Sequence, residues 1–424
     1  RPAAAAPVTQ LDRTTRRQHM VSPARHRVLI VGGGTAGITV AARLRRAGLD
    51  GVAVLEPSDV HYYQPLWTLV GGGEADIAGT ARPEIGLIPP GVRWIRDAAA
   101  GFDPDAATVT TAAGRTLRYD TLVVAAGLQL GWDRVTGLPE AIDPDDAGGG
   151  RVSSNYRVDL APRTWQLIRT LRSGTALFTM PTGPIKCAGA PQKIAYLAAD
   201  YWRKQGLLGD IRIVLVLPEP AMFKVPEFSA VLDRVAARYR IEVRLRSELV
   251  GVDGPRQEAT ILDQATGAKQ TLRYDLLHAV PPQSAPDVIA RSPLADPDSP
   301  FGYVEVDRHT LRSARYPNMF ALGDVANLPT SKTGAAIRKQ APVLVANLRT
   351  GLAGGTPSAR YDGYSSCPFL TARHKVLLAE FDYDLRPTPS IPLLDLQRER
   401  TDMWLLKRYA LPAFYWHRML RGRG

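Results

Sequence analysis

Cysteine is scarce in this sequence, with two residues among 424. Two thiols cannot form a disulfide framework, and they leave no set of thiolate ligands for a structural zinc ion. The seven histidines lack H-x-x-x-H spacing, so we predict no metal site. The sequence also lacks any run of about 18 uncharged apolar residues, the length that a membrane-spanning helix needs. We therefore expect no segment that spans a bilayer.

Acidic residues are outnumbered, since 41 Asp and Glu face 53 Lys and Arg, for a net charge of +12. A basic surface favours an anionic partner. The basic residues form no long runs and no nucleic-acid module is recognisable, so we expect a negatively charged membrane surface and no nucleic acid. Residues 1–26 contain a single acid and no apolar signal core. We expect them to be a disordered leader, with a cleaved transit peptide as the alternative.

A dinucleotide-binding pattern begins at His26. The apolar run Val28–Val31 predicts a buried parallel strand. The turn that follows has the spacing G-x-G-x-x-G, with glycines at Gly32, Gly34 and Gly37. Such glycines allow a tight turn, close approach of a pyrophosphate and close packing of the next helix. A second apolar run, 52–55, ends in Glu56, 19 residues after the last glycine, where a carboxylate can accept hydrogen bonds from an adenosine ribose.

Two later segments indicate which dinucleotide is bound. The apolar strand predicted in 119–130 ends near Gly127, and the segment 316–348 contains Gly323-Asp324 before a predicted helix. Together with the first glycine pattern, they resemble the signature of the two-dinucleotide-domain (disulfide reductase-like) flavoprotein superfamily. This resemblance implies FAD, with Asp324 on the ribityl chain and the helix N-terminus directed at the flavin. We add Lys332 as a candidate cofactor-binding residue.

A second strand–helix–strand unit follows at 175–217, where such a fold would bind NAD(P)H. Its connecting loop, 181–191, is about ten residues long and carries Pro184 among the amides that a diphosphate would need. We therefore predict a second Rossmann-like domain without a nucleotide fingerprint. The electrons are expected to arrive by another route than NADH.

The first cysteine, Cys187, lies in this proline-rich loop just before the predicted helix. Lys186, Lys193 and the helix dipole would favour its thiolate form. The alternative is an inert, buried cysteine that packs as a small hydrophobic residue. Cys367 precedes Pro368, and we expect it on a constrained loop. If folding brings the two sulfurs together beside a flavin, they form a redox dithiol that exchanges two electrons.

Five segments closely resemble the sulfide:quinone oxidoreductase family, in its mitochondrial-like (type II) branch, and the resemblance runs from about His26 to Gly422. The segments are PTGPIKCAGAPQK (181–193), HYYQPLWTLVGGG (61–73), NLPTSKTGAA (327–336), YDGYSSCP (361–368) and LLAEFDY (377–383). Other branches carry a third cysteine. Val325 follows Asp324 here, so we expect FAD to be held without a covalent bond.

The resemblance implies an activity and roles for the two cysteines. Sulfide would attack a bridge between Cys187 and Cys367 and leave a persulfide on Cys367. The freed thiolate of Cys187 would then pass two electrons through FAD to a membrane quinone, and a small-molecule acceptor would take the sulfane sulfur. The alternatives are a type II NADH:quinone oxidoreductase and a non-enzymatic flavoprotein interaction factor.

The expected architecture is α/β, with two Rossmann-like domains and a C-terminal amphipathic helical segment. We assign 27–150 and 300–365 to the FAD domain, 151–299 to the second domain with the cysteine loop, and 366–424 to a quinone and membrane segment. Residues 401–424 mix aromatic with basic side chains, which suits a helix at the lipid headgroups, although packing on the core or in a dimer is the alternative. Pro412 is expected to break this segment into two short helices.

Lys193, Phe381 and Tyr383 are predicted near the flavin or quinone. The protein would then be peripheral, at the cytoplasmic face of a bacterial plasma membrane or the matrix side of the mitochondrial inner membrane. A homodimer is a further expectation.

Overall fold

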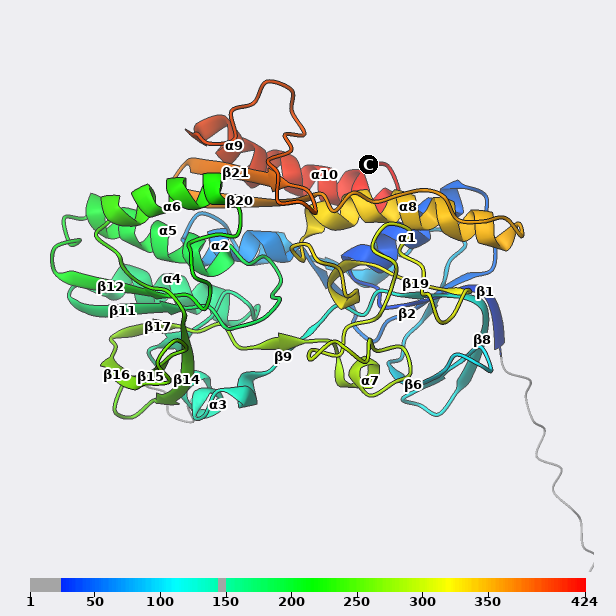
Figure 1. Ribbon diagram of the computed structural model, residues 1–424, viewed down its shortest axis with the longest axis horizontal. Helices are drawn as coiled ribbons and strands as arrows, with labels where there is room; N and C mark the ends of the chain where they lie inside the picture. Colours follow the sequence, from blue (N-terminus) through cyan, green and yellow to red (C-terminus); the bar gives the residue numbers. More distant parts are fainter. Residues whose placement is uncertain (1–23, 144–149) are drawn as a thin grey trace, which may run out of the picture.

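The computed structural model describes residues 24–143 and 150–424, which form two α/β lobes with a C-terminal segment across one edge of both (Figure 1). This arrangement confirms the predicted class of two Rossmann-like domains with a C-terminal helical segment. The predicted leader lies outside the described residues up to position 23. Strand β1 begins at Ala24, so the last three residues of the predicted leader belong to the first lobe.

The first lobe contains a seven-stranded sheet in the order β5-β2-β1-β8-β7-β6, with β19 also paired to β8. The first βαβ unit follows the sequence prediction, because the apolar second half of β1 (28–31) and the apolar β2 are buried in the parallel part of the sheet. The elements of this lobe and its connections are β1 (Ala24–Val31), α1 (Thr35–Arg46), β2 (Val52–Leu55), β3 (Val60–Tyr62), α2 (Trp67–Gly71), β4 (Ala81–Pro83), β5 (Arg93–Ile95), β6 (Ala99–Asp103), β7 (Thr108–Thr111), β8 (Thr116–Val124), β9 (Gln129–Leu130), β18 (Gln283–Ser284), α7 (Asp287–Ala290), β19 (Met319–Ala321) and α8 (Gly334–Leu352).

The second lobe contains a five-stranded parallel sheet in the order β10-β17-β11-β12-β13 and a three-stranded antiparallel sheet, β14-β15-β16. Its second βαβ unit, β11-α5-β12, covers 174–216, against the predicted range 175–217. The elements are α3 (Leu138–Ile142), β10 (Val152–Ser153), α4 (Leu160–Thr170), β11 (Gly174–Thr179), α5 (Ala190–Lys204), β12 (Ile211–Val216), α6 (Pro226–Arg238), β13 (Glu242–Arg244), β14 (Ser247–Asp253), β15 (Glu258–Asp263), β16 (Lys269–Arg273) and β17 (Leu276–His278).

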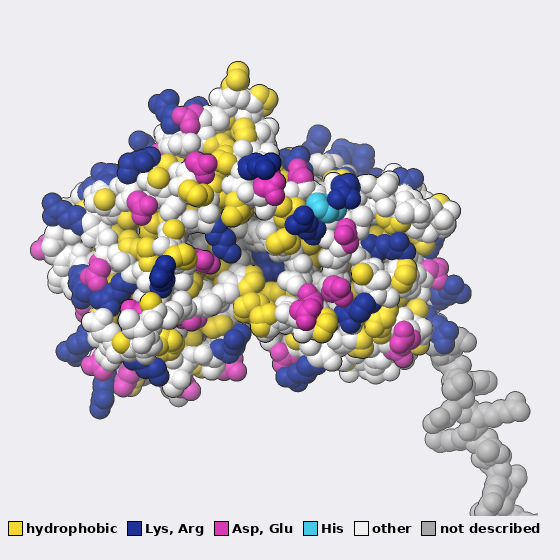
Figure 2. All heavy atoms as spheres, viewed as in Figure 1, with side chains coloured by type: hydrophobic (Ala, Val, Ile, Leu, Met, Phe, Trp, Pro, Cys, Tyr) yellow, Lys and Arg dark blue, Asp and Glu magenta, His cyan; other side chains and the backbone are white. Residues whose placement is uncertain are grey.

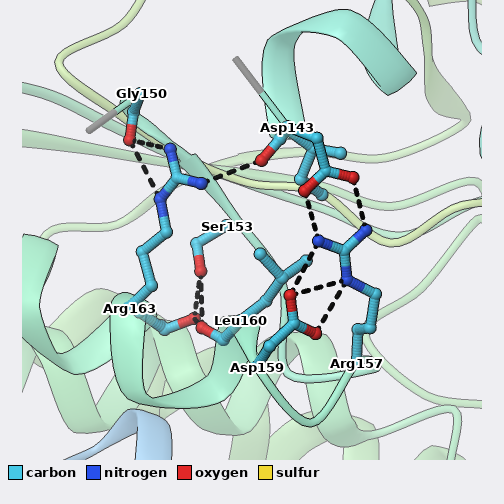
Figure 3. A network of polar contacts seen from close by, with 9 residues as sticks. Asp143, Gly150, Ser153, Arg157, Asp159, Leu160 and Arg163 are labelled. Carbon is cyan, nitrogen blue, oxygen red and sulfur yellow. Dashed lines mark hydrogen bonds and ion pairs between the residues drawn. The ribbon is translucent and has the colours of Figure 1, made fainter. Parts of the chain in front are cut away.

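A polar network fixes the start of the second lobe (Figure 3). The Arg157 guanidinium bonds the carboxylates of Asp143, which follows α3, and Asp159, which precedes α4. Arg163 of α4 donates to the carbonyl oxygens of Gly150 and Ile142. Charge-assisted bonds of this kind are stronger than neutral ones. They hold the end of α3 against the first turns of α4.

The C-terminal segment is part strand and part helix. It consists of β20 (Ser365–Ala372), β21 (Lys375–Phe381), β22 (Glu399–Arg400), α9 (Thr401–Leu405), a π-helical turn (Leu406–Ala410), α10 (Leu411–His417) and a 3-10 turn (Met419–Arg421). Two predictions are wrong here. Cys367 lies within β20, paired with Ala379, rather than on a loop. Pro412 occupies the first turn of α10, where its missing N–H costs nothing, so the π-helical turn and not the proline divides the helices. No helix in the described part of the chain has the length and apolar character to cross a membrane.

Candidate functional site

The first glycine loop has the geometry of a dinucleotide cradle. Gly32 has φ of +105°, and a Cβ there would lie 2.4 Å from the carbonyl oxygen of Ala125. A Cβ on Gly37 would lie 1.8 Å from the Gly32 carbonyl oxygen, so only glycine allows α1 to pack this closely. A Cβ on Gly34 would meet no atom within 4 Å, which leaves open space at the N-terminus of α1. Amide donors and the helix dipole at such a terminus suit a pyrophosphate.

Glu56 stands beside this loop at the end of β2. Its Oε2 accepts a hydrogen bond of 2.7 Å from the Gly33 amide, and its Oε1 accepts one of 2.7 Å from the Ser58 amide. Burial raises the pKa of this carboxyl group, although the two backbone donors oppose the shift. The residue is therefore placed against the glycine loop, as the ribose-binding prediction requires.

The Gly323-Asp324 turn reaches the same place from β19. A Cβ on Gly323 would lie 3.2 Å from the Cβ of Ala36 in the first turn of α1, so the turn abuts the glycine loop. Among the described residues, the Asp324 carboxylate accepts no hydrogen bond, and burial raises its pKa. A partly exposed acceptor without partners fits the hydroxyl-rich ribityl chain of FAD. Gly127, which follows β8, has φ of +69° and open space at its Cβ position.

Lys332 stabilises the Gly323-Asp324 turn. Its buried ammonium donates to the carbonyl oxygens of Asp324 (2.6 Å) and Ala326 (3.0 Å), and it lies 3.7 Å from the centre of the Tyr303 ring. Burial lowers its pKa to about 8, against the influence of the Asp324 carboxylate. The predicted cofactor-binding lysine thus holds the Gly323-Asp324 turn in shape, and direct contact with the cofactor stays a prediction.

The two cysteines, 180 positions apart in sequence, meet between the lobes. Their Sγ atoms lie 3.8 Å apart. Cys187 has φ of +51°, a strained value for a non-glycine residue, and its amide donates to the Lys332 carbonyl oxygen at 2.9 Å. Cys367 reaches it because Gly189 leaves room: a Cβ on Gly189 would lie 2.6 Å from the Cys367 Sγ. The cysteine loop, the Gly323-Asp324 turn and β20 therefore share one site.

The charges at this site differentiate the two sulfurs. The hydrogen bond from the Cys367 thiol lowers the pKa of Cys187 well below its usual range, and the Lys193 ammonium, whose Nζ donates to its Sγ at 3.0 Å, adds to that effect. The same hydrogen bond, together with burial, raises the pKa of Cys367. Burial opposes the charged form of Lys193, but the adjacent sulfurs raise its pKa overall. The pair therefore contains one thiolate, on Cys187.

Lys186 is not in contact with the Cys187 sulfur as predicted, because its Nζ donates to the Gln64 side chain at 2.6 Å. Lys407, a buried residue of the π-helical turn, was not predicted here, and it also lowers the pKa of Cys187. Burial lowers the pKa of Lys407 to about 8. A lysine from the C-terminal segment had no local signal that tied it to a cysteine 220 positions earlier, although π-helical turns are frequent at functional sites.

Replacement of Lys193 by methionine should move thiolate formation at Cys187 to higher pH. The substitution removes the ammonium in contact with the sulfur, so the pKa of Cys187 rises and less thiolate is present at neutral pH. The measurement is the pH dependence of iodoacetamide labelling of the reduced protein, followed by mass spectrometry of the Cys187 peptide. Lys186→Met is the matched control and should leave the midpoint in place. An unchanged midpoint in Lys193→Met would contradict the assigned contact.

The second nucleotide site is filled by the protein itself. Three amides of the loop between β11 and α5 already donate to protein acceptors: Thr182 to Glu248, Lys186 to Gln283 and Cys187 to Lys332, each at 2.9 Å. A Cβ on Gly183 would lie 2.6 Å from the Phe301 ring, so this ring packs directly against the loop. Amides that serve protein acceptors cannot also hold a pyrophosphate, which agrees with the predicted absence of an NADH fingerprint.

The remaining predicted residues have packing partners. Phe381 is buried against Phe223, with ring centres 5.6 Å apart. The Tyr383 hydroxyl donates to the Arg308 carbonyl oxygen at 2.7 Å. Their proximity to quinone stays a prediction.

The C-terminal aromatic residues divide into two groups. Leu405 and Tyr409 are 50% and 57% exposed, whereas Tyr415 and Trp416 are buried. The second half of the predicted membrane helix therefore packs on the core, which was the alternative.

Comparison with known proteins identifies the family of this chain. Residues 26–341 match the family described as pyridine nucleotide-disulphide oxidoreductase. The mitochondrial sulfide:quinone oxidoreductase of Dictyostelium discoideum is 42% identical over 94% of this chain and 86% of its own, and that of Mus musculus is 40% identical over 94% and 87%. The crystal structure of sulfide:quinone oxidoreductase from Aquifex aeolicus superimposes with a TM-score of 0.78 at 19% identity, over 94% of this chain and 92% of that one, and so supports the fold. The chain belongs to the pyridine nucleotide-disulphide oxidoreductase family and, within it, to the sulfide:quinone oxidoreductases.

Proposed function

We propose that this protein oxidises sulfide with FAD as its cofactor and passes the electrons to a quinone. The observation that carries the proposal is the contact of two cysteine sulfurs at 3.8 Å, one of them with a depressed pKa, beside the turn that fits FAD. Sulfide is largely the anion HS⁻ at neutral pH. Its oxidation needs a sulfur electrophile and a two-electron acceptor, and a cysteine bridge beside a flavin supplies both.

The two cysteines have different roles. In the oxidised enzyme Cys187 and Cys367 form a bridge, which a small side-chain movement from contact distance to a bond of about 2.05 Å provides. HS⁻ attacks the Cys367 sulfur, a new S–S bond forms there, and the electron pair of the broken bridge stays on Cys187. A thiol with a low pKa leaves fastest in such an exchange, so the depressed pKa of Cys187 favours attack at Cys367.

The cycle closes when the sulfane sulfur leaves. A small nucleophile takes the outer sulfur of the Cys367 persulfide, and Cys187 and Cys367 rejoin as they give up two electrons. Bound FAD supplies the two-electron acceptor that hands these electrons to quinone. Lys193 holds the Cys187 thiolate. Asp324 and Glu56 would accept hydrogen bonds from the cofactor hydroxyls, and the N-terminus of α1 would receive the pyrophosphate. In one turn of the cycle HS⁻ loses one proton and two electrons: its sulfur leaves on the acceptor as sulfane sulfur, and the two electrons reach the quinone.

A membrane surface is the proposed location of the quinone. Several large apolar side chains of the C-terminal segment are exposed: Leu385, Ile391, Leu393, Leu405 and Tyr409. In Figure 2, hydrophobic side chains reach the tip of the projection at the top of the molecule, where Figure 1 draws the loop that precedes α9. Exposed apolar side chains beside basic ones suit contact with lipid headgroups. The names of the related proteins favour the mitochondrial inner membrane over a bacterial plasma membrane.

Leu393→Glu should reduce co-flotation with anionic phospholipid vesicles severalfold, and equal flotation of the variant would contradict the contact.

The test of the activity is an anaerobic titration of the FAD-loaded protein with sulfide and, separately, with NADH. The proposal predicts loss of the oxidised-flavin absorbance with sulfide and no loss with NADH. Reduction by NADH instead would favour a type II NADH:quinone oxidoreductase. No reduction by either donor would favour a flavoprotein without enzymatic activity.

A further inference from the structure

A chain of buried polar groups connects the C-terminal helix α10 to the glycine loop. The Glu84 Oε2 lies 3.1 Å from the His61 Nδ1, and the His61 Nε2 lies 2.5 Å from the Tyr415 hydroxyl. The Tyr415 hydroxyl lies 2.8 Å from the Thr35 hydroxyl. Thr35 is the first residue of α1. Four side chains from three separate regions of the sequence thus end at the N-terminus of the helix that receives the pyrophosphate.

The chain touches the glycine loop at both ends. At one end, Tyr415 bonds Thr35, immediately after Gly34. At the other, the Glu84 Oε1 is buried, has no hydrogen-bond partner among the residues that the structure describes, and lies 2.8 Å from the place of a Cβ on Gly33. Gly33 is therefore packed between this carboxylate and Glu56, whose side chain lies 2.6 Å from the same point. Tyr415, Glu84 and Glu56 therefore support the glycine loop, and none of them takes part in the proposed sulfur chemistry.

Close packing around Tyr415 fixes its hydroxyl beside Thr35. The Tyr63 ring lies 4.4 Å from the Tyr415 ring, and Arg82 lies 5.1 Å from the centre of the Trp416 ring. Tyr415 is 4% exposed and Trp416 7%. Beyond α10, a Cβ on Gly422 would lie 2.9 Å from backbone atoms of α1, so the end of the chain also packs on that helix.

We propose that α10 clasps the FAD site: Tyr415 fixes the Thr35 hydroxyl and the first turn of α1, so that FAD binding and the seating of residues 411–421 depend on each other. Such coupling is reciprocal by thermodynamic necessity. Whatever loosens α10 weakens FAD binding, and bound FAD holds α10 in place. Because α9 and the π-helical turn carry the exposed Leu405 and Tyr409 and lead directly into α10, this part of the proposed membrane contact is also tied to cofactor retention. The inference rests on FAD binding to this loop and not on the sulfide reaction.

The first experiment compares FAD release from three holoenzymes after dilution, followed by the fluorescence of free FAD. Tyr415→Phe removes the hydroxyl between His61 and Thr35 but keeps the ring, and it should raise the dissociation constant for FAD about tenfold, a typical effect for a buried hydrogen-bonded group. Tyr63→Phe is the matched control, because the Tyr63 hydroxyl makes no hydrogen bond within the described residues. It should release FAD as the wild type does. Equal release from Tyr415→Phe and wild type would overturn the proposal.

A double-mutant cycle separates the clasp from general loosening of the fold. Thr35→Val and Tyr415→Phe each break the same contact, so their effects on FAD affinity should be less than additive when combined. Fully additive effects would mean that the two hydroxyls act independently and would overturn the proposal.

Proteolysis reports the reverse direction of the coupling. Arg418 follows α10 and is exposed, but trypsin needs local opening to cleave there. Excess FAD should slow this cleavage in the wild-type holoenzyme and should have a smaller effect in Tyr415→Phe. Cleavage that is independent of FAD concentration in the wild type would contradict the clasp. Because none of these three experiments measures turnover, a failure of the proposed sulfide activity would leave all three results interpretable.

Discussion

Cys187→Ser should lower sulfide-dependent quinone reduction by about a thousandfold or more, the range seen when a group that acts as part of a catalytic unit is removed. Serine keeps the size of the side chain but cannot form a bridge, so HS⁻ finds no sulfur electrophile. It also removes the thiolate that Lys193 contacts at 3.0 Å. In an anaerobic stopped-flow experiment, the flavin absorbance of this variant should stay unchanged after mixing with sulfide.

Cys367→Ser should abolish turnover to the same extent, but the two variants differ in a second measurement. Cys187 retains its ammonium neighbour in Cys367→Ser and should still react rapidly with iodoacetamide, whereas the Cys367 thiol left in Cys187→Ser should react slowly because burial raises its pKa. Ser366→Ala, next to Cys367 in β20, is the matched control and should keep both FAD and turnover. Flavin bleaching by sulfide at the wild-type rate in either cysteine variant would remove the central role of the pair.

The sequence was sufficient for the features whose signals are local. The first βαβ unit could be predicted because an uninterrupted apolar strand, three spaced glycines and Glu56 lie within 30 residues. The expectation that the second unit lacks a nucleotide fingerprint also rests on a local signal, because proline removes amide donors at the place where they would be needed. In both cases one stretch of chain determines the geometry.

The arrangement around the thiols could not be predicted in the same way. Residues from α5, β20 and the π-helical turn meet there, and nothing in the local pattern says that Lys193 and Lys407 approach Cys187 while Lys186 turns to Gln64. Cys367 was expected on a loop because Pro368 follows it. The proline is tolerated because β20 is an edge strand of the sheet β20-β21-β22, and an edge strand has backbone positions that need no N–H donor.

In the C-terminal segment, the sequence pattern could not show which side chains face lipid and which face the protein core. A mixture of aromatic and basic residues at helical spacing is compatible with a lipid surface and with a protein surface, since both accept an apolar stripe. The π-helical turn changes the face that the helix presents, so Tyr415 and Trp416 pack inward while Leu405 and Tyr409 stay exposed. The sequence pattern therefore predicted the helices but not which half contacts the core.

Two glycine variants should separate the fold of the dinucleotide loop from its affinity for FAD. In Gly37→Ala the new methyl group would lie 1.8 Å from the carbonyl oxygen of Gly32, a backbone atom that cannot turn aside. We expect the free energy of unfolding to fall by about 3 kcal/mol, the cost of severe overpacking, and FAD to be lost with the loop geometry. Urea unfolding followed by circular dichroism measures the first effect, and flavin absorbance per protein measures the second.

Gly34→Ala should lose FAD without losing stability. Gly34 has φ of −67°, which alanine adopts without strain, and the new methyl group meets no protein atom within 4 Å. It would instead occupy the space in which a pyrophosphate approaches the N-terminus of α1. Loss of two charge-assisted hydrogen bonds at about 1.5 kcal/mol each weakens binding by roughly a hundredfold. A Gly34→Ala protein that unfolds as the wild type does but retains FAD at wild-type affinity would show that the cofactor does not bind against this helix terminus.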